Sequence, residues 1–263
     1  MTDVLRELDR CVFCDAIGVT EEHLIADWAY RAFVRKRRLH DELFLRGRFV
    51  GPGQLQMHSE SEAIPTAKVV CGPCNNGWMS GIDQAASRVL RPLIRGEREA
   101  VLDPDGQAAA AAWIFKSALI LDVADHGIGG PLASLRPAFA ESRMAPPGCV
   151  IYAGPAGAPP SLTVGDPPTT VNLWMLGVRP ANGRMRVTGS VRHPDGTITS
   201  GVPRDIPIPG YQVMVGAFWA YVGGHLPPVT PESLVGFEQV WPVQEVPVTF
   251  RAASLRTAKD GMS

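Results

Sequence analysis

The sequence predicts an α+β fold, and three features of the chain lead to that prediction. Four cysteines in two C-x-x-C pairs, Cys11 with Cys14 and Cys71 with Cys74, have the composition and spacing of a structural zinc site. An alanine-rich segment over 107–125 is apolar on nearly every side, which indicates a buried helix. In the last third of the chain, short apolar runs separated by glycine and proline are typical of antiparallel strands. We therefore expect two domains, a zinc-binding domain over 1–100 and a C-terminal α+β domain with a buried helix and an antiparallel β-sheet over 101–263.

The composition limits the classes of function that are open to the chain. With 45% hydrophobic residues and a net charge of −1, its 263 residues can bury a core but carry no basic coat, so nucleic-acid binding must be local. The N-terminus lacks an apolar signal-peptide core, and no run of about 18 apolar residues predicts a membrane span. Five cysteines without a secretion signal indicate a reducing, cytoplasmic compartment, which favours metal ligation over disulfides. Cys149, outside the pairs, is expected to be a buried, unreactive thiol.

The first hundred residues are expected to hold short elements around the cysteine pairs. The segment at 80–95 carries apolar residues every three or four positions, and Pro92 inside it is expected to kink or shorten the helix. No element is predicted for the basic stretch 34–50 or for the turn-rich stretch 51–65. The expected elements are a helix at 3–10, an extended piece at 22–25, a helix at 27–33, a strand at 68–70 and a helix at 80–95.

The second half begins with a turn over 102–106, which we take as the domain boundary. The buried helix at 107–125 follows, and one helical turn is expected near 135–141. The sequence His193-Pro194-Asp195-Gly196 is typical of a hairpin turn, which predicts antiparallel pairing of its flanking strands. The predicted strands are 149–153, 170–178, 185–192, 197–200, 212–222 and 237–243, and the last dozen residues are expected to be a frayed tail.

A carboxylate and a histidine lie between the two cysteine pairs. Glu22 and His23 are adjacent, Asn75 directly follows the last cysteine, and a predicted helix comes next. This order resembles the zinc-bearing HNH endonucleases, also called ββα-metal nucleases, and within them a subgroup of bacterial HNH-like proteins. The resemblance covers residues 11 to about 95. It implies a treble-clef, ββα-metal fold for the zinc-binding domain.

The resemblance also implies an activity, the metal-dependent hydrolysis of DNA phosphodiester bonds. His23 would be the general base that deprotonates water, since imidazole side chains titrate near neutral pH. Glu22 and Asn75 would hold a catalytic Mg²⁺ or Mn²⁺, because a divalent ion with few protein ligands keeps positions open for phosphate. The four cysteines would hold a structural zinc ion, which is coordinatively closed. The chain departs from the family pattern at Thr66, where asparagine or histidine is usual.

Binding partners are expected on both halves of the chain. The basic run of Arg35, Lys36, Arg37 and Arg38 follows the predicted site and would neutralise DNA phosphates without reading sequence. The C-terminal domain is expected to bind a protein partner or a second copy of the chain.

Two other functions fit the same residues. The zinc-binding domain could be a catalytically inactive scaffold that binds a partner protein or nucleic acid. His23 and Glu22 would then only satisfy local contacts, and Asn75 would cap the following helix. Alternatively, the scaffold could serve another metal-dependent reaction on a small molecule. A deep closed pocket containing His23 would favour the small-molecule reaction, whereas an open basic groove would favour the nuclease.

Overall fold

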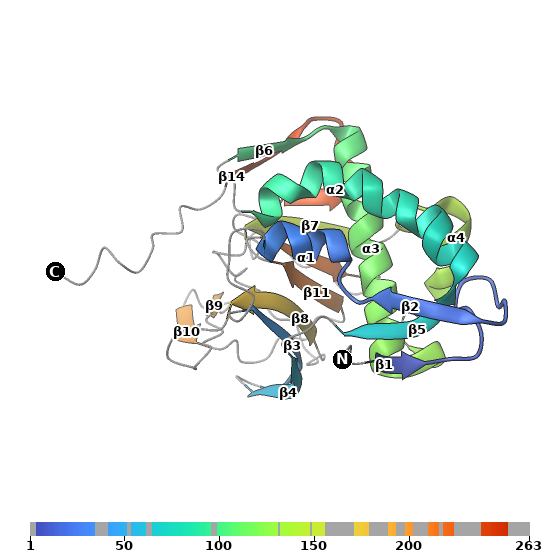
Figure 1. Ribbon diagram of the computed structural model, residues 1–263. Coiled ribbons are helices and arrows are strands. Elements are labelled where there is room, and N and C mark those ends of the chain that lie inside the picture. The colour runs from blue at the N-terminus through green and yellow to red at the C-terminus, as the bar shows by residue number, and fades with distance from the viewer. Residues whose placement is uncertain are drawn as a thin grey trace.

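A computed structural model gives the fold of the protein (Figure 1). Its largest sheet has seven strands, a smaller sheet has three, and helix α3 passes through the centre of the molecule. The residues that the structure describes are 4–34, 42–51, 54–61, 65–95, 99–130, 132–147, 149–155, 171–178, 189–192, 198–201, 210–215, 218–223 and 238–251.

The small sheet carries both cysteine pairs at one end of its strands. Its strand order is β1-β5-β2, with β1 parallel and β2 antiparallel to the central strand β5. The predicted helix at 3–10 is wrong: this segment forms β1, because pairing with β5, more than sixty residues away, satisfies its backbone groups. The extended piece expected at 22–25 ends instead at His23. The strands are β1 (Val4–Glu7), β2 (Val19–His23) and β5 (Thr66–Cys71).

The seven-stranded sheet joins segments from both halves of the chain, in the order β13-β7-β12-β11-β8-β3-β4. Strand β3 pairs antiparallel with β8, so the stretches left without a predicted element supply two of the seven strands. No local signal reveals such strands, because their hydrogen-bond partners lie far away in sequence. The division of the chain at residue 100 stays a prediction. The strands are β3 (Glu42–Gly51), β4 (Gln54–Ser61), β7 (Val150–Pro155), β8 (Val171–Val178), β11 (Gly210–Val215), β12 (Phe218–Gly223) and β13 (Glu238–Trp241).

The predicted antiparallel sheet of the second half is confirmed in most of its pairings. One pairing differs, because β11 runs parallel to β8. The single strand expected over 212–222 is also wrong, because this stretch contains two strands, β11 and β12, that pair antiparallel with each other. Residues 193–196, the predicted hairpin turn, lie outside the described residues, as do 185–188. Two further antiparallel pairs are β9 (Gly189–Arg192) with β10 (Ile198–Gly201), and β6 (Glu99–Leu102) with β14 (Val248–Arg251).

Helix α3 (Pro104–His126) confirms the predicted buried helix and organises the core. Its N-terminus is set by Asp103, whose carboxylate accepts a hydrogen bond of 2.7 Å from the backbone N–H of Gly106, with Pro104 at the first helical position. The helix is long and apolar enough to cross a membrane, yet 89% of its most apolar 18-residue window is buried inside the protein. In Figure 1, α2 crosses α3 and the small sheet lies beside its lower half. Helix α3 is therefore a core helix.

The other helices surround α3. Helix α2 continues two residues beyond Pro92, so the proline does not end the helix and only the hydrogen bond of its missing N–H is lost. The helical turn η1 precedes it and is interrupted at Gly77. The helices are α1 (Asp27–Val34), η1 (Cys74–Met79), α2 (Ser80–Ile94), η2 (Gly127–Gly129), η3 (Ala133–Leu135) and α4 (Arg136–Ser142).

Aromatic rings join the first cysteine pair to the second half of the chain. Phe13, between Cys11 and Cys14, lies 5.2 Å from the ring of Trp78 and 6.4 Å from that of Phe139 on α4. Trp78 and Phe139 are 5.7 Å apart, edge to face. The guanidinium of Arg143 lies over Trp78 at 4.1 Å. This cluster packs the cysteine-bearing loop against α4.

Gly130 allows a buried ion pair behind this cluster to form. Asp122, fully buried on α3, accepts hydrogen bonds from Arg136 at 2.9 Å and from the backbone N–H of Leu132 at 3.2 Å. A Cβ atom at position 130 would overlap both carboxylate oxygens of Asp122. Gly130→Ala is therefore expected to lower the free energy of unfolding by about 1–3 kcal/mol, measured by urea denaturation. Gly129→Ala is the matched control, because a Cβ there meets no atom within 4 Å, and equal losses in both variants would contradict the prediction.

Candidate functional site

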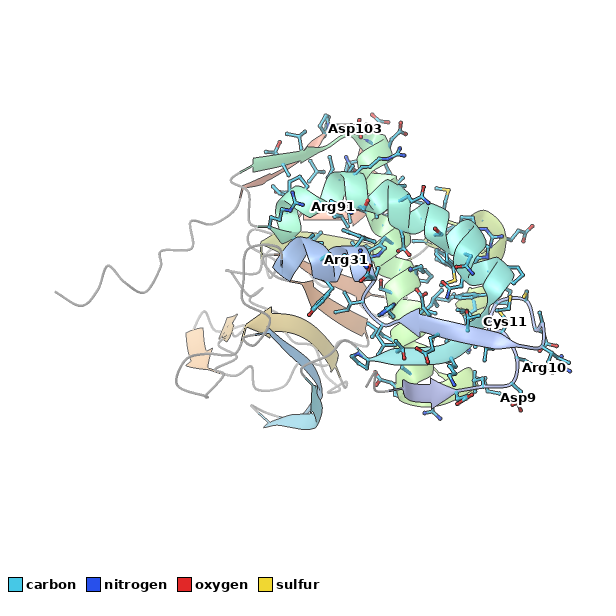
Figure 2. The ribbon with its side chains drawn as sticks, in the orientation of Figure 1. Asp9, Arg10, Cys11, Arg31, Arg91 and Asp103 are labelled. Carbon is cyan, nitrogen blue, oxygen red and sulfur yellow. The ribbon has the colours of Figure 1, made fainter. Side chains whose placement is uncertain are left out.

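The two cysteine pairs meet at one end of the small sheet. Cys11 and Cys14 lie on the loop after β1 (Figure 2 labels Cys11), Cys71 ends β5, and Cys74 begins η1. All four sulfur atoms lie within 4.8 Å of one another, with Cys14 to Cys71 at 3.5 Å and Cys14 to Cys74 at 3.7 Å. A tetrahedral zinc ion with Zn–S bonds of about 2.3 Å places its sulfurs about 3.8 Å apart. The four cysteines could therefore hold a zinc ion with little movement.

Backbone hydrogen bonds shape the first cysteine loop. The N–H of Cys11 donates to the carbonyl of Ala16 at 2.9 Å, and the N–H of Asp15 donates to the carbonyl of Cys11 at 2.9 Å. Asp15 adopts a left-handed conformation, with φ of 59°, which closes this turn. The N–H of Val12 donates to the carbonyl of Val69 on β5 at 3.0 Å. The loop is thus fixed to the strand that carries the second pair.

The electrostatics of the cluster favour a bound cation. Burial, then the neighbouring thiols of Cys14 and Cys71, raise the pKa of Cys74 to about 12, against an opposing hydrogen bond with Trp78. Burial also acts to raise the pKa of Cys11, but hydrogen bonds with the backbone of Cys71 and its own loop outweigh it and hold that pKa below its ordinary value. Crowded thiols resist ionisation unless a metal cation compensates their charge. Within the described residues, no other cluster of three or more His, Cys, Asp or Glu side chains converges closely enough to hold a metal ion.

A separate pocket of about 330 Å³ contains Glu22 and His23. Both residues come from the end of β2, and the wall opposite them comes from α1 and from one face of α2. The α2 residues recur at intervals of three or four, the spacing of one helix face. Figure 2 shows Arg91 well away from Cys11, so the pocket and the cysteine cluster are distinct places. The pocket is lined by Glu22, His23, Ala26, Asp27, Trp28, Ser80, Asp83, Gln84, Ser87 and Arg91.

A buried lysine beneath this pocket binds two of its carboxylates. Lys116 on α3 has a side chain only 2% exposed, and its ammonium group donates to Glu22 Oε1 at 3.0 Å. It also donates to both carboxylate oxygens of Asp83 on α2, at 2.8 and 2.9 Å. Burial acts to lower the pKa of Lys116, but the charges of Glu22 and Asp83 outweigh it and raise that pKa above its ordinary value. Lys116 is therefore a charged group that joins β2, α2 and α3.

Sequence reasoning missed Asp83 and Lys116 as site residues. Lys116 itself was the available signal in the sequence. A lysine in an otherwise apolar, buried helix requires an ionic partner, so its presence predicts a buried ion pair. The identity of its partners was not accessible, because Glu22 lies 94 residues away along the chain.

The structure brings Glu22 and His23 together in the pocket but does not bring Asn75 to it. The amide Nδ2 of Asn75 donates to Thr20 Oγ1 and to the carbonyl of Glu21, both at 3.1 Å, which ties the start of η1 to β2. Its Oδ1 atom makes no hydrogen bond in the described part of the chain, so its metal-ligand role stays a prediction.

Thr66 is described by the structure, whereas the predicted basic run is not. Thr66 lies directly opposite His23 in the β2–β5 pair and is buried, with its hydroxyl lacking a partner among the described residues. The basic run at 35–38 lies outside the described residues, so its role in binding DNA stays a prediction.

Comparisons with models of known protein families, with curated proteins and with solved structures find no match. The resemblance to HNH endonucleases therefore rests on the motif residues of this chain.

Proposed function

We propose that the chain is a metal-dependent, HNH-type endonuclease that hydrolyses DNA phosphodiester bonds in the pocket beside His23. The observation that carries this proposal is the position of His23, next to Glu22 at the end of β2, in a pocket whose far wall is α2. The order of cysteine loop, antiparallel strands β2 and β5, and a helix begun by the second cysteine pair supports a treble-clef, ββα-metal arrangement.

The charges around the pocket support dependence on a divalent metal. Its three carboxylates pair with only two cations, since Glu22 and Asp83 share Lys116 and Asp27 pairs with Arg31 at 2.8 Å. Among the described residues that line the pocket, Arg91 adds one further positive charge, which brings the sum to about zero. The pocket therefore lacks the excess positive charge that a phosphodiester needs, and Mg²⁺ or Mn²⁺ would supply it.

The donor set fits such an ion. Lys116 uses Oε1 of Glu22, and Oε2 makes no hydrogen bond among the described residues. Magnesium ions in proteins often have one or two carboxylate ligands and keep several positions for water and phosphate. Glu22 would hold the ion, and the ion would supply Lewis-acid stabilisation of the phosphate. Asn75, the second ligand expected from the sequence, lies outside the pocket lining, so water and phosphate would fill the remaining coordination positions.

His23, Arg91 and Trp28 have separate roles in the proposed reaction. His23 accepts the proton of the attacking water through its imidazole. Arg91 donates hydrogen bonds to a non-bridging phosphate oxygen and orients the substrate. The indole of Trp28 lies under the Arg91 guanidinium, with 6.0 Å from Cζ to the ring centre, and limits the directions in which the arginine can extend.

Arg91→Ala is expected to raise KM for DNA about tenfold while changing kcat less than about threefold. A charged hydrogen bond to phosphate contributes on the order of 1.5–3 kcal/mol, and about 1.4 kcal/mol corresponds to tenfold. Steady-state nicking kinetics measure the effect. Arg88→Ala, on the same helix but exposed and outside the pocket lining, is the matched control, and an equal change in KM there would contradict a specific contact.

The direct test is a plasmid-nicking assay on the zinc-loaded protein. We expect nicking with Mg²⁺ or Mn²⁺ and none when EDTA removes the divalent ion under conditions in which zinc stays bound. A folded, zinc-loaded protein that leaves plasmid intact with both ions would overturn the proposal.

A small phosphodiester is the second candidate substrate, and the size of the pocket favours it. A volume of about 330 Å³ lies at the lower end of the range of about 300–1,000 Å³ found for small-molecule sites, and a duplex could only reach the pocket by its edge. Hydrolysis of bis(p-nitrophenyl) phosphate without plasmid nicking would favour this candidate over the nuclease.

A further inference from the structure

The structure assigns Lys116 a positioning role in the pocket: its ammonium group, oriented by Asp83, holds the Glu22 carboxylate in the geometry in which it binds the divalent ion. This inference rests on the proposed function, because it assigns Glu22 as the ligand. It also makes the reaction depend on α3, the central helix of the second half of the chain.

The burial of Lys116 excludes direct contact with a substrate. Its ammonium group contacts one oxygen of Glu22 and both oxygens of Asp83. Its side chain is 2% exposed, so a substrate in the pocket cannot reach it. Lys116 therefore acts through the carboxylates that it binds.

The geometry of the three residues orients Glu22. Asp83 contacts the ammonium group with both oxygens, from the α2 side. On the β2 side the ammonium group donates to Oε1 of Glu22, whose side chain is only 9% exposed. The carboxylate is thus held at one oxygen, and among the described residues nothing occupies the other oxygen, which can take a ligand.

Partners behind a metal ligand commonly affect metal affinity and activity, and their removal costs about 10–100-fold. Lys116→Met alone leaves two buried carboxylates without their cation and is expected to fold poorly. The double variant Lys116→Met with Asp83→Asn also removes one of these charges. The double variant is therefore expected to fold better than Lys116→Met alone, while the Glu22 carboxylate still lacks the ammonium group that orients it.

The experiment compares zinc content, thermal unfolding, Mn²⁺ affinity by calorimetry and nicking kinetics in the full chain. The folded double variant is expected to bind Mn²⁺ about tenfold more weakly and to lose at least about tenfold in kcat, with KM for DNA changed less than about threefold. Ser117→Ala, at the next buried position of α3, is the control expected to keep both values, since among the described residues the Ser117 hydroxyl bonds to the carbonyl of Trp113 and to no pocket residue.

The outcomes separate this inference from the proposed function. A folded double variant with wild-type Mn²⁺ affinity and kcat overturns the inference and leaves the nuclease standing. Mn²⁺ binding that weakens in the double variant, in a protein that never nicks DNA, supports the inference and overturns the nuclease. No Mn²⁺ binding by the wild type overturns the inference.

Asp83→Asn alone covers the case in which the double variant does not fold. It retains the Lys116–Glu22 pair and is expected to fold, with Mn²⁺ affinity and kcat lowered about threefold or more because the lysine is held less firmly. Wild-type values for both quantities in this variant overturn the inference.

Discussion

Cys71→Ser is expected to abolish zinc binding and to remove the cooperative unfolding transition of the protein. Cys71 ends β5, the central strand of the small sheet, and its side chain is buried against the other three cysteines. Structural zinc sites contribute apparent free energies of about 10–16 kcal/mol, and a whole domain is stable by only about 5–15 kcal/mol. The free energy lost with the zinc ion is therefore as large as the whole free energy of unfolding of a typical domain. Zinc released to a colorimetric chelator and a circular-dichroism melt measure the two effects.

Cys149→Ala is the matched control for this prediction. Cys149 is also buried, and burial raises the pKa of its thiol, but it lies outside the cysteine cluster. We expect this variant to keep one zinc ion per chain and to lose only about 1–2 kcal/mol, the cost of a small cavity. A wild-type protein without zinc, or a Cys71→Ser variant that melts within a few degrees of the wild type, would show that the cysteines have no metal-dependent structural role.

His23→Ala is expected to lower the nicking rate by at least about a hundredfold while leaving the fold intact. A positioned general base contributes about 10²–10⁴-fold to a hydrolysis. The side chain of His23 is exposed, so its removal should change the free energy of unfolding by no more than about 0.5 kcal/mol. Single-turnover nicking at saturating Mn²⁺ measures the chemical step without interference from product release.

A control variant and a chemical rescue test whether the effect is specific to the His23 imidazole. His126→Ala removes another exposed histidine, at the end of α3 and outside the pocket lining, and should leave the rate unchanged. Added imidazole should restore part of the activity of His23→Ala, because it can occupy the space of the lost base. Nicking by His23→Ala within about threefold of wild type would exclude His23 as the base and favour the inactive-scaffold alternative.

Much of the local structure could be predicted from the sequence because its causes are local. Helix α2 follows from apolar residues at helical spacing, and α3 follows from its length and composition. The β1 segment and the β3–β4 pair could not be predicted in this way, since a strand is stabilised by partners that the local pattern does not identify. The stretch at 34–50, where charge dominates the composition, holds β3 because β8 lies beside it.

The two C-x-x-C pairs identify from the sequence the four cysteines that could hold a metal ion, because this spacing brings two thiols into each turn and thiolates favour zinc. Glu22 is likewise beside His23 in any fold, since the two residues are adjacent in the chain. Which surface these two residues face depends on the tertiary structure. Folding brought Asp83, Arg91 and Lys116 to them from two helices, and it tied Asn75 to the backbone of β2 instead of to the pocket. The physical reason is that a buried charge is stable only beside its counter-charge, and the packing of α2 and α3 against β2 determines where that counter-charge lies.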